Sequence, residues 1–203
     1  MLKIRLSNHK LFIVMFIALI LMACGTSKKA VMPENDDIVI SEEYGIDTEL
    51  SDKFQQAVEL MKSKKYKMAI ELLIEVTDKT KKHSAPYINL AIAYSKIGNV
   101  QDAEKILLRA KNINPQHPVT NNELGLLYRK TGRFSKAKKT YENIIKRYPQ
   151  FLPARKNLGI LCDIFMADLD CAISQYEAFL KFQPENKKVK IWLVDLKRRA
   201  GQQ

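Results

Sequence analysis

Apolar and small residues recur along this chain with a period of 34 residues. The period appears when the segment around Tyr94 is aligned with the segment around Tyr128. Strong helix formers dominate the composition, and Gly and Pro occur only seven times each, so each unit is expected to consist of helices rather than tightly turned strands. The units defined in this way are 50–83, 84–117, 118–151 and 152–186.

The pattern inside each unit resembles the tetratricopeptide repeat, a pair of antiparallel helices with bulky, small and aromatic residues at fixed positions. We number positions from the first residue of each unit and leave out one inserted residue in the fourth. The second unit matches at positions 4, 7, 8, 11, 20, 24, 27 and 32, with Tyr87, Leu90, Ala91, Tyr94, Ala103, Leu107, Ala110 and Pro115. The third and fourth units keep most of these positions, whereas the first departs at Lys53 and Gln56.

Each characteristic position of the repeat has a physical role. Small residues at positions 8 and 20 allow the two helices to cross closely, and large residues at positions 11 and 24 fill the flanks. Gly98 and Gly132 are expected to end the first helices, because glycine adopts the left-handed conformation at least cost. One unit cannot bury its apolar face alone, so the units must stack. We therefore predict an all-α solenoid over 50–203, with four helical hairpins and a capping helix at 187–200.

The N-terminal residues 1–23 have the pattern of an export signal. Basic residues precede Leu11–Ala23, an uncharged apolar run of thirteen residues that is short for a membrane-spanning helix. The sequence that ends at Cys24 resembles the bacterial lipobox, which implies diacylglyceryl and fatty-acyl chains on this cysteine after cleavage. The alternatives are an uncleaved signal anchor and a cleaved signal followed by an ordinary cysteine. In enteric-type bacteria, Gly25 in place of Asp implies the outer membrane, with the protein facing the periplasm.

Residues 24–49 are predicted to form a tether. This segment is polar, carries Pro33 and is acidic up to Glu49, and Asp36–Ser41 is its only apolar patch. The chain as a whole has a net charge of +12, so the repeat region is strongly basic. A basic surface favours acidic partners or anionic membranes, and export makes nucleic acid a poor candidate.

The first helices of the repeats are expected to line a groove. Position 9 is aliphatic in all four units, and lysines recur at position 13. We interpret this as an apolar stripe bordered by lysines that binds an apolar-acidic peptide or an amphipathic helix. The alternative is that the stripe belongs to the core, and the acidic tether could itself fold back into the groove. The candidate groove residues are Phe54, Val58, Lys62, Ile88, Ile92, Lys96, Asn122, Leu126, Lys130, Lys156 and Ile160.

Catalytic and metal-binding patterns are weak. Cys162 and Cys171 lie nine residues apart on the two helices of the fourth hairpin, and we favour two packed thiols over a disulfide. His83 and His117 occupy the same inter-repeat position and are interpreted as turn residues rather than metal ligands. The sequence contains no nucleophile elbow, phosphate-binding loop or paired acid and base, so we expect neither an enzyme nor a cofactor.

The leading functional hypothesis is a lipid-anchored adaptor that assembles an envelope machine through protein contacts. The chain resembles the small repeat lipoproteins that serve pilus and secretin assembly. Accessory roles for peptidoglycan enzymes or outer-membrane protein assembly are alternatives, and so is a structural lipoprotein that forms homo-oligomers through its groove and capping helix.

Overall fold

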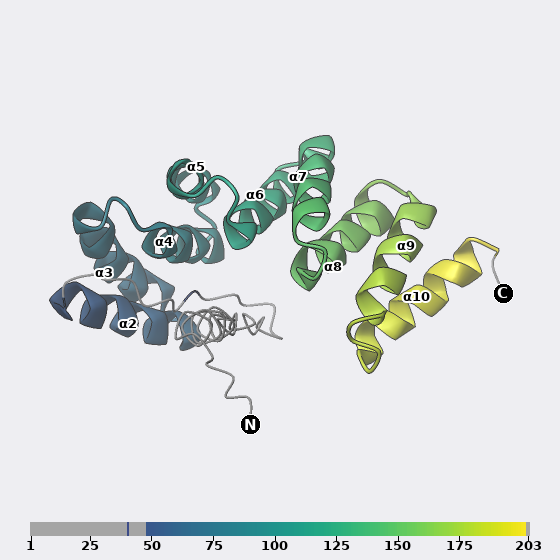
Figure 1. The fold of residues 1–203 in the computed structure, drawn as a ribbon, viewed down its shortest axis with the longest axis horizontal. Coiled ribbons are helices and arrows are strands. Elements are labelled where there is room, and N and C mark those ends of the chain that lie inside the picture. The colour runs from purple at the N-terminus through teal and green to yellow at the C-terminus, as the bar shows by residue number, and fades with distance from the viewer. Residues whose placement is uncertain (1–39, 41–47, 202–203) are drawn as a thin grey trace, which may run out of the picture. The chain divides into compact units, whose positions relative to one another are not determined.

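The computed structural model describes Ile40 and residues 48–201. Within these residues the chain is all-helical, and helical hairpins follow one another along the sequence (Figure 1). The predicted all-α array with a C-terminal helix is confirmed. The helices are α2 (Thr48–Lys62), α3 (Tyr66–Lys79), α4 (Ser84–Lys96), α5 (Val100–Ile113), α6 (Pro118–Lys130), α7 (Phe134–Arg147), α8 (Leu152–Ile160), the π-helix η1 (Leu161–Phe165), α9 (Leu169–Leu180) and α10 (Lys187–Arg199).

The hairpins α2–α3, α4–α5, α6–α7 and α8–α9 correspond to the four sequence units, and η1 continues α8. α2 begins at Thr48, so the last two residues of the predicted tether are already helical. Each hairpin packs against the next, and α10 packs against α9. Buried apolar residues form two clusters, one around the first two hairpins and one from the second hairpin to α10.

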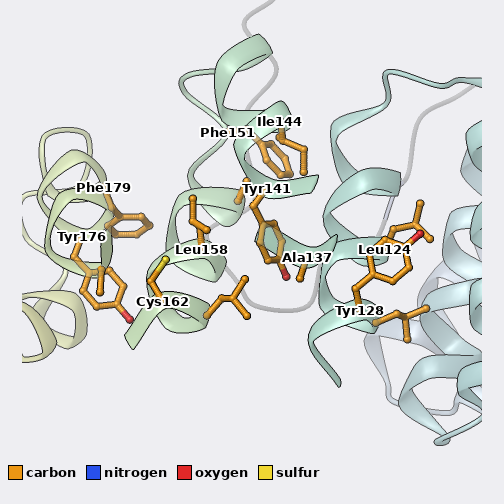
Figure 2. Close-up of a cluster of buried hydrophobic side chains, with 14 of the residues drawn as sticks. Leu124, Tyr128, Ala137, Tyr141, Ile144, Phe151, Leu158, Cys162, Tyr176 and Phe179 are labelled. Atoms are coloured by element: carbon orange, nitrogen blue, oxygen red, sulfur yellow. The ribbon is translucent and has the colours of Figure 1, made fainter. Parts of the chain in front are cut away.

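The two helices of each hairpin touch through positions 8 and 24. The first two hairpins pair Ala with Leu there (Ala57 with Leu73, Ala91 with Leu107), and the last two pair Gly with Tyr (Gly125 with Tyr141, Gly159 with Tyr176). A Cβ atom on Gly125 would lie 2.5 Å from Cε1 of Tyr141, and one on Gly159 would lie even closer to Cε1 of Tyr176. Figure 2 shows the Tyr141 ring between the helices that carry Leu124 and Leu158. The larger ring is therefore accommodated by the loss of a methyl group on the facing helix.

Every hairpin turn places a residue in the left-handed region at position 15. Gly98 (φ 86°) and Gly132 (φ 74°) occupy this position in the second and third hairpins, as predicted. Lys64 (φ 58°) and Ala167 (φ 53°) occupy it in the first and fourth. The turn geometry thus belongs to the fold, and two of the four repeats adopt it without glycine, at a cost of about 1–2 kcal/mol each.

The inserted residue of the fourth unit lies in η1. In the first three hairpins, the residue after the left-handed position donates its N–H to the carbonyl five residues back, as Asn99 does to Tyr94 at 2.9 Å. In the fourth hairpin the corresponding bond spans six residues, from Asp168 N–H to the Cys162 carbonyl, also at 2.9 Å. A π-helical turn holds one more residue than an α-helical turn, so it absorbs the insertion without displacing the hairpin.

Ion pairs connect neighbouring hairpins at equivalent repeat positions, but the acidic and the basic residue exchange places from one pair to the next. Arg133 donates to both carboxylate oxygens of Glu104 at 2.8 and 2.7 Å, which lowers the pKa of Glu104. One repeat later, Lys138 contacts Asp168 at 3.1 Å. The acid lies on the earlier hairpin in the first pair and on the later hairpin in the second. This alternation favours the native order of stacking, although each partly exposed pair adds only up to about 1 kcal/mol.

Replacing Gly125 with Ala should destabilise the protein, although Ala is normally the better helix former. The new methyl group collides with the Tyr141 ring, and overpacking of this kind costs about 1–3 kcal/mol. Adding Tyr141→Leu to Gly125→Ala recreates the Ala91–Leu107 pair and should recover much of the loss. Urea unfolding of the wild type, both single variants and the double variant measures the coupling. Additive effects would contradict the packing argument.

Replacing Lys64 with Gly should stabilise the protein by about 1 kcal/mol, because the backbone strain at this exposed position disappears. The matched control is Gly98→Ala at the same turn position of the next hairpin, which should lose a similar amount although no neighbouring atom is within 4 Å of the new Cβ. Thermal unfolding checks both. A loss of stability in Lys64→Gly would show that the turn does not strain this residue.

Candidate protein-binding surface

The predicted groove residues of the first two hairpins are buried. Phe54 and Val58 on α2, and Ile88 and Ile92 on α4, all belong to the first buried cluster. Lys62 and Lys96 are exposed at the ends of the same helices. In this half, the apolar stripe therefore lies beneath other groups and is not open to solvent.

One of these covering groups is Ile40, from the predicted tether. Its side chain belongs to the same buried cluster, with 6 % of its surface exposed. Its backbone N–H donates to Oδ1 of Asn89 at 3.0 Å, and its carbonyl accepts from Nδ2 of Asn89 at 2.8 Å. Asn89 is completely buried on α4. A single side-chain amide thus satisfies both backbone groups of one residue that lies 49 positions earlier in the chain.

The groove residues of the last two hairpins are more accessible. Leu126 on α6 and Ile160 on α8 are half-buried, and Lys130 is exposed. Ile164 and Phe165 of η1, which follow on the same stretch of chain, are among the exposed large apolar residues of the described chain. Arg129 lies over the Phe165 ring at 5.8 Å from its centroid. Aliphatic and aromatic side chains next to cationic groups form the open part of this surface.

Polar side chains are buried along the first helices as well. Asn122 on α6 accepts a hydrogen bond from Nδ2 of Asn157 on α8 at 3.0 Å and donates to Glu123 at 3.3 Å. Lys156, the remaining predicted groove residue, is half-buried on α8. The first helices therefore bury amides at Asn89, Asn122 and Asn157 in addition to aliphatic residues.

Sequence reasoning included Asn122 but missed Asn89 and Asn157. Both occupy position 6 of their units. Asn89 lies between Ile88 and Leu90, and Asn157 is followed by Leu158. An asparagine is unfavourable in a helix interior, and a buried amide requires partners. Its recurrence at one repeat position is the signal that could have identified these residues.

The expectation of two packed thiols is wrong, because the structure bonds Cys162 to Cys171 as a disulfide. Cys162 lies in η1 and Cys171 in the first turn of α9, so the short turn between them brings their Cα atoms to 5.9 Å. This separation falls within the range that a disulfide requires. The bond joins the two helices of the fourth hairpin across the inserted residue.

Asp168 lies beside this disulfide, so that Cys162, Asp168 and Cys171 bring ligand-type atoms within 4.8 Å of one another. The two sulfurs are bonded to each other. Asp168 caps α9 by accepting from the Cys171 N–H at 3.1 Å and also pairs with Lys138, and these contacts lower the pKa of its carboxyl. The group is therefore a structural cap and crosslink.

The two repeated histidines occupy helix starts. His83 is the N-cap residue of α4, and His117 is the N-cap residue of α6, where its Nδ1 accepts from the Thr120 N–H at 3.4 Å. Their recurrence at one repeat position therefore follows from the turns between hairpins.

Cys24 and the export signal lie outside the described residues. Among the helices that the structure describes, none combines the length and apolar character that a membrane crossing requires.

The comparisons with known proteins agree with this architecture. Two tetratricopeptide-repeat family models match, one over residues 60–120 and the other over residues 123–150. These two segments therefore match tetratricopeptide repeats, a class of generally non-catalytic modules that bind other proteins. No curated protein sequence matches the chain.

Solved structures share the fold at low sequence identity. MamA from Desulfovibrio magneticus RS-1 has 18% identity and a TM-score of 0.66, covering 77% of this chain and 88% of its own. A thermophilic tetratricopeptide-repeat protein from Thermus thermophilus has 20% identity and a TM-score of 0.66, covering 73% and 81%. PilF from Pseudomonas aeruginosa has 15% identity and a TM-score of 0.68, covering 74% and 68%.

Proposed function

We propose that this protein is a membrane-tethered adaptor that binds a protein partner on the open half of its groove. The observation that carries the proposal is the exposed apolar surface of η1, where two thirds of Ile164 is accessible, while Leu126 on α6 and Ile160 at the end of α8 are half-buried. Large exposed apolar side chains in a groove are typical of a surface that a partner covers.

The surrounding charges favour an apolar segment with acidic flanks. Lys130 and Lys96 are exposed at the ends of the first helices. Arg129 and Arg133 lie over the rings of Phe165 and Tyr128, at 5.8 and 4.6 Å from their centroids. Cationic groups next to aliphatic ones suit an acidic amphipathic helix or an extended acidic peptide.

The membrane anchor in this proposal is the lipid on Cys24. The basic start, the apolar run of thirteen residues and the lipobox-like sequence support it, and several acyl chains together give stable attachment. Gly25 favours sorting to the outer membrane, with the repeats in the periplasm. The disulfide at Cys162–Cys171 is compatible with that oxidising compartment.

The partner machine that we favour is a pilus or secretin assembly system. The lipoprotein signal combined with a repeat array supports this choice, and the structural likeness to PilF is consistent with it. Accessory roles for peptidoglycan enzymes or for outer-membrane protein assembly are alternatives, because they too would use a tethered repeat array to bind a protein partner.

A second candidate function is self-association through the two ends of the array. Between α2 and α3 lies a hollow of about 650 Å³ that includes Leu60, Met68, Leu72 and the acidic Glu59 and Glu71. At the other end, α10 exposes 67 % of Ile191 and 69 % of Val194 among lysines and arginines. Opposite charges around two apolar surfaces favour head-to-tail contact between copies.

Replacing Cys24 with Ser should abolish lipid attachment, because the serine hydroxyl cannot form the thioether. We expect loss of incorporated radiolabelled palmitate and release of the protein from the membrane fraction. Cys171→Ser, which removes a cysteine of the folded part, should keep the label. A Cys24→Ser protein that stays membrane-bound, together with a wild type that is never labelled, would instead indicate an uncleaved signal anchor.

A photo-crosslinking residue at Ile164 should capture one discrete partner in cells. The same residue at Lys105, exposed on α5, is the control and should capture none. Mass spectrometry of the products identifies the machine. A product that contains only this protein would favour self-association, and the absence of any product specific to Ile164 would contradict the adaptor proposal.

A further inference from the structure

The pairing of Asn89 with Ile40 has the geometry of peptide recognition. Asn89 binds the N–H and the C=O of the same residue, as one strand binds its neighbour in a sheet. A side chain that satisfies both groups recognises the peptide backbone, and these two hydrogen bonds do not depend on the side chain of the bound residue. The apolar cluster that holds the Ile40 side chain, with Phe54 and Val58, supplies a preference for an apolar residue.

Asn89 also requires an occupant. It lies in the interior of α4 with none of its surface exposed, between Ile88 and Leu90. If Ile40 left without a replacement, the amide would exchange two hydrogen bonds to a peptide backbone for hydrogen bonds to water. An asparagine flanked by apolar residues in a helix interior therefore gains most where a peptide backbone lies against it.

We propose that Asn89 and the surrounding pocket form a peptide-binding site that is filled, in the unpartnered protein, by the chain's own Ile40. A partner segment of the same chemistry, an extended apolar stretch with acidic neighbours, binds by displacing it. This inference rests on the proposed adaptor function and assigns it a second contact region, in the first two hairpins.

The position of Ile40 in the sequence supports an internal occupant. Seven residues separate it from the start of α2, so the segment is a permanent neighbour of its own pocket. A short connection of this kind gives an effective concentration in the millimolar range. The flanking residues Asp36, Asp37, Glu42 and Glu43 are acidic, which complements the basic repeats. A partner therefore competes with a segment that resembles it.

The first readout is hydrogen–deuterium exchange of the full chain in detergent micelles. We expect the stretch that contains Ile40 to exchange slowly in the wild type and at the free-chain rate in Asn89→Ala. Asn112→Ala, which removes an exposed asparagine on α5, is the matched control and should leave the protection intact. Free exchange at Ile40 in the wild type would overturn the proposal.

The second readout is binding of a fluorescent synthetic peptide that spans residues 34–47. Ile40→Asp places a charge in the apolar pocket and should unseat the internal segment while leaving every helix unchanged, which circular dichroism checks. This variant should bind the peptide at least about tenfold more tightly than the wild type. Adding Asn89→Ala to it should abolish binding.

Equal binding by the wild type and Ile40→Asp, or no binding by either, would overturn the proposal. Crosslinking at Ile164 tests the open half of the groove separately. Failure of the peptide-site inference is therefore distinguishable from failure of the adaptor function.

Discussion

The close contact between positions 8 and 24 is the constraint on which the array depends. The second helix of each hairpin lies near enough to the first that Gly125 has no room for a methyl group beside Tyr141. With the two helices held this close, each hairpin presents a fixed face to the next, and the left-handed residue at position 15 closes the hairpin. The predicted groove depends on this geometry, because its residues lie on the first helices of successive hairpins.

Within this frame, the two halves of the groove differ in chemistry. The first half is filled, and its buried amide at Asn89 is satisfied by the backbone of Ile40. The second half exposes Ile164 and Phe165 and carries no comparable cover among the described residues. An aliphatic row in the sequence therefore corresponds to core at one end and to accessible surface at the other, which explains why a repeat pattern alone does not separate the two interpretations.

The sequence was sufficient to predict the helical hairpins and the glycines of the turns, because these features depend on residues a few positions apart. Other features depend on contacts that the repeat pattern does not encode. Lys64 and Ala167 adopt a glycine conformation without being glycine. The disulfide depends on how η1 absorbs one residue, which decides whether two cysteines nine apart face each other. The partner of Asn89 lies 49 residues away and outside the repeats, so it could be found only in three dimensions.

The Ile40 contact also limits how far the folded array can lie from its membrane anchor. For a chain anchored at Cys24, sixteen residues lead to Ile40 and twenty-four lead to Thr48. A fully extended chain spans at most about 3.3–3.6 Å per residue, so the folded array can reach about 55 Å from its lipid while Ile40 is seated and about 80 Å once it is released. Exchange of one peptide segment for another would then change the length of the free tether. With a partner bound, the radius within which the array can move around its anchor would grow by about half, without any change in the repeats themselves.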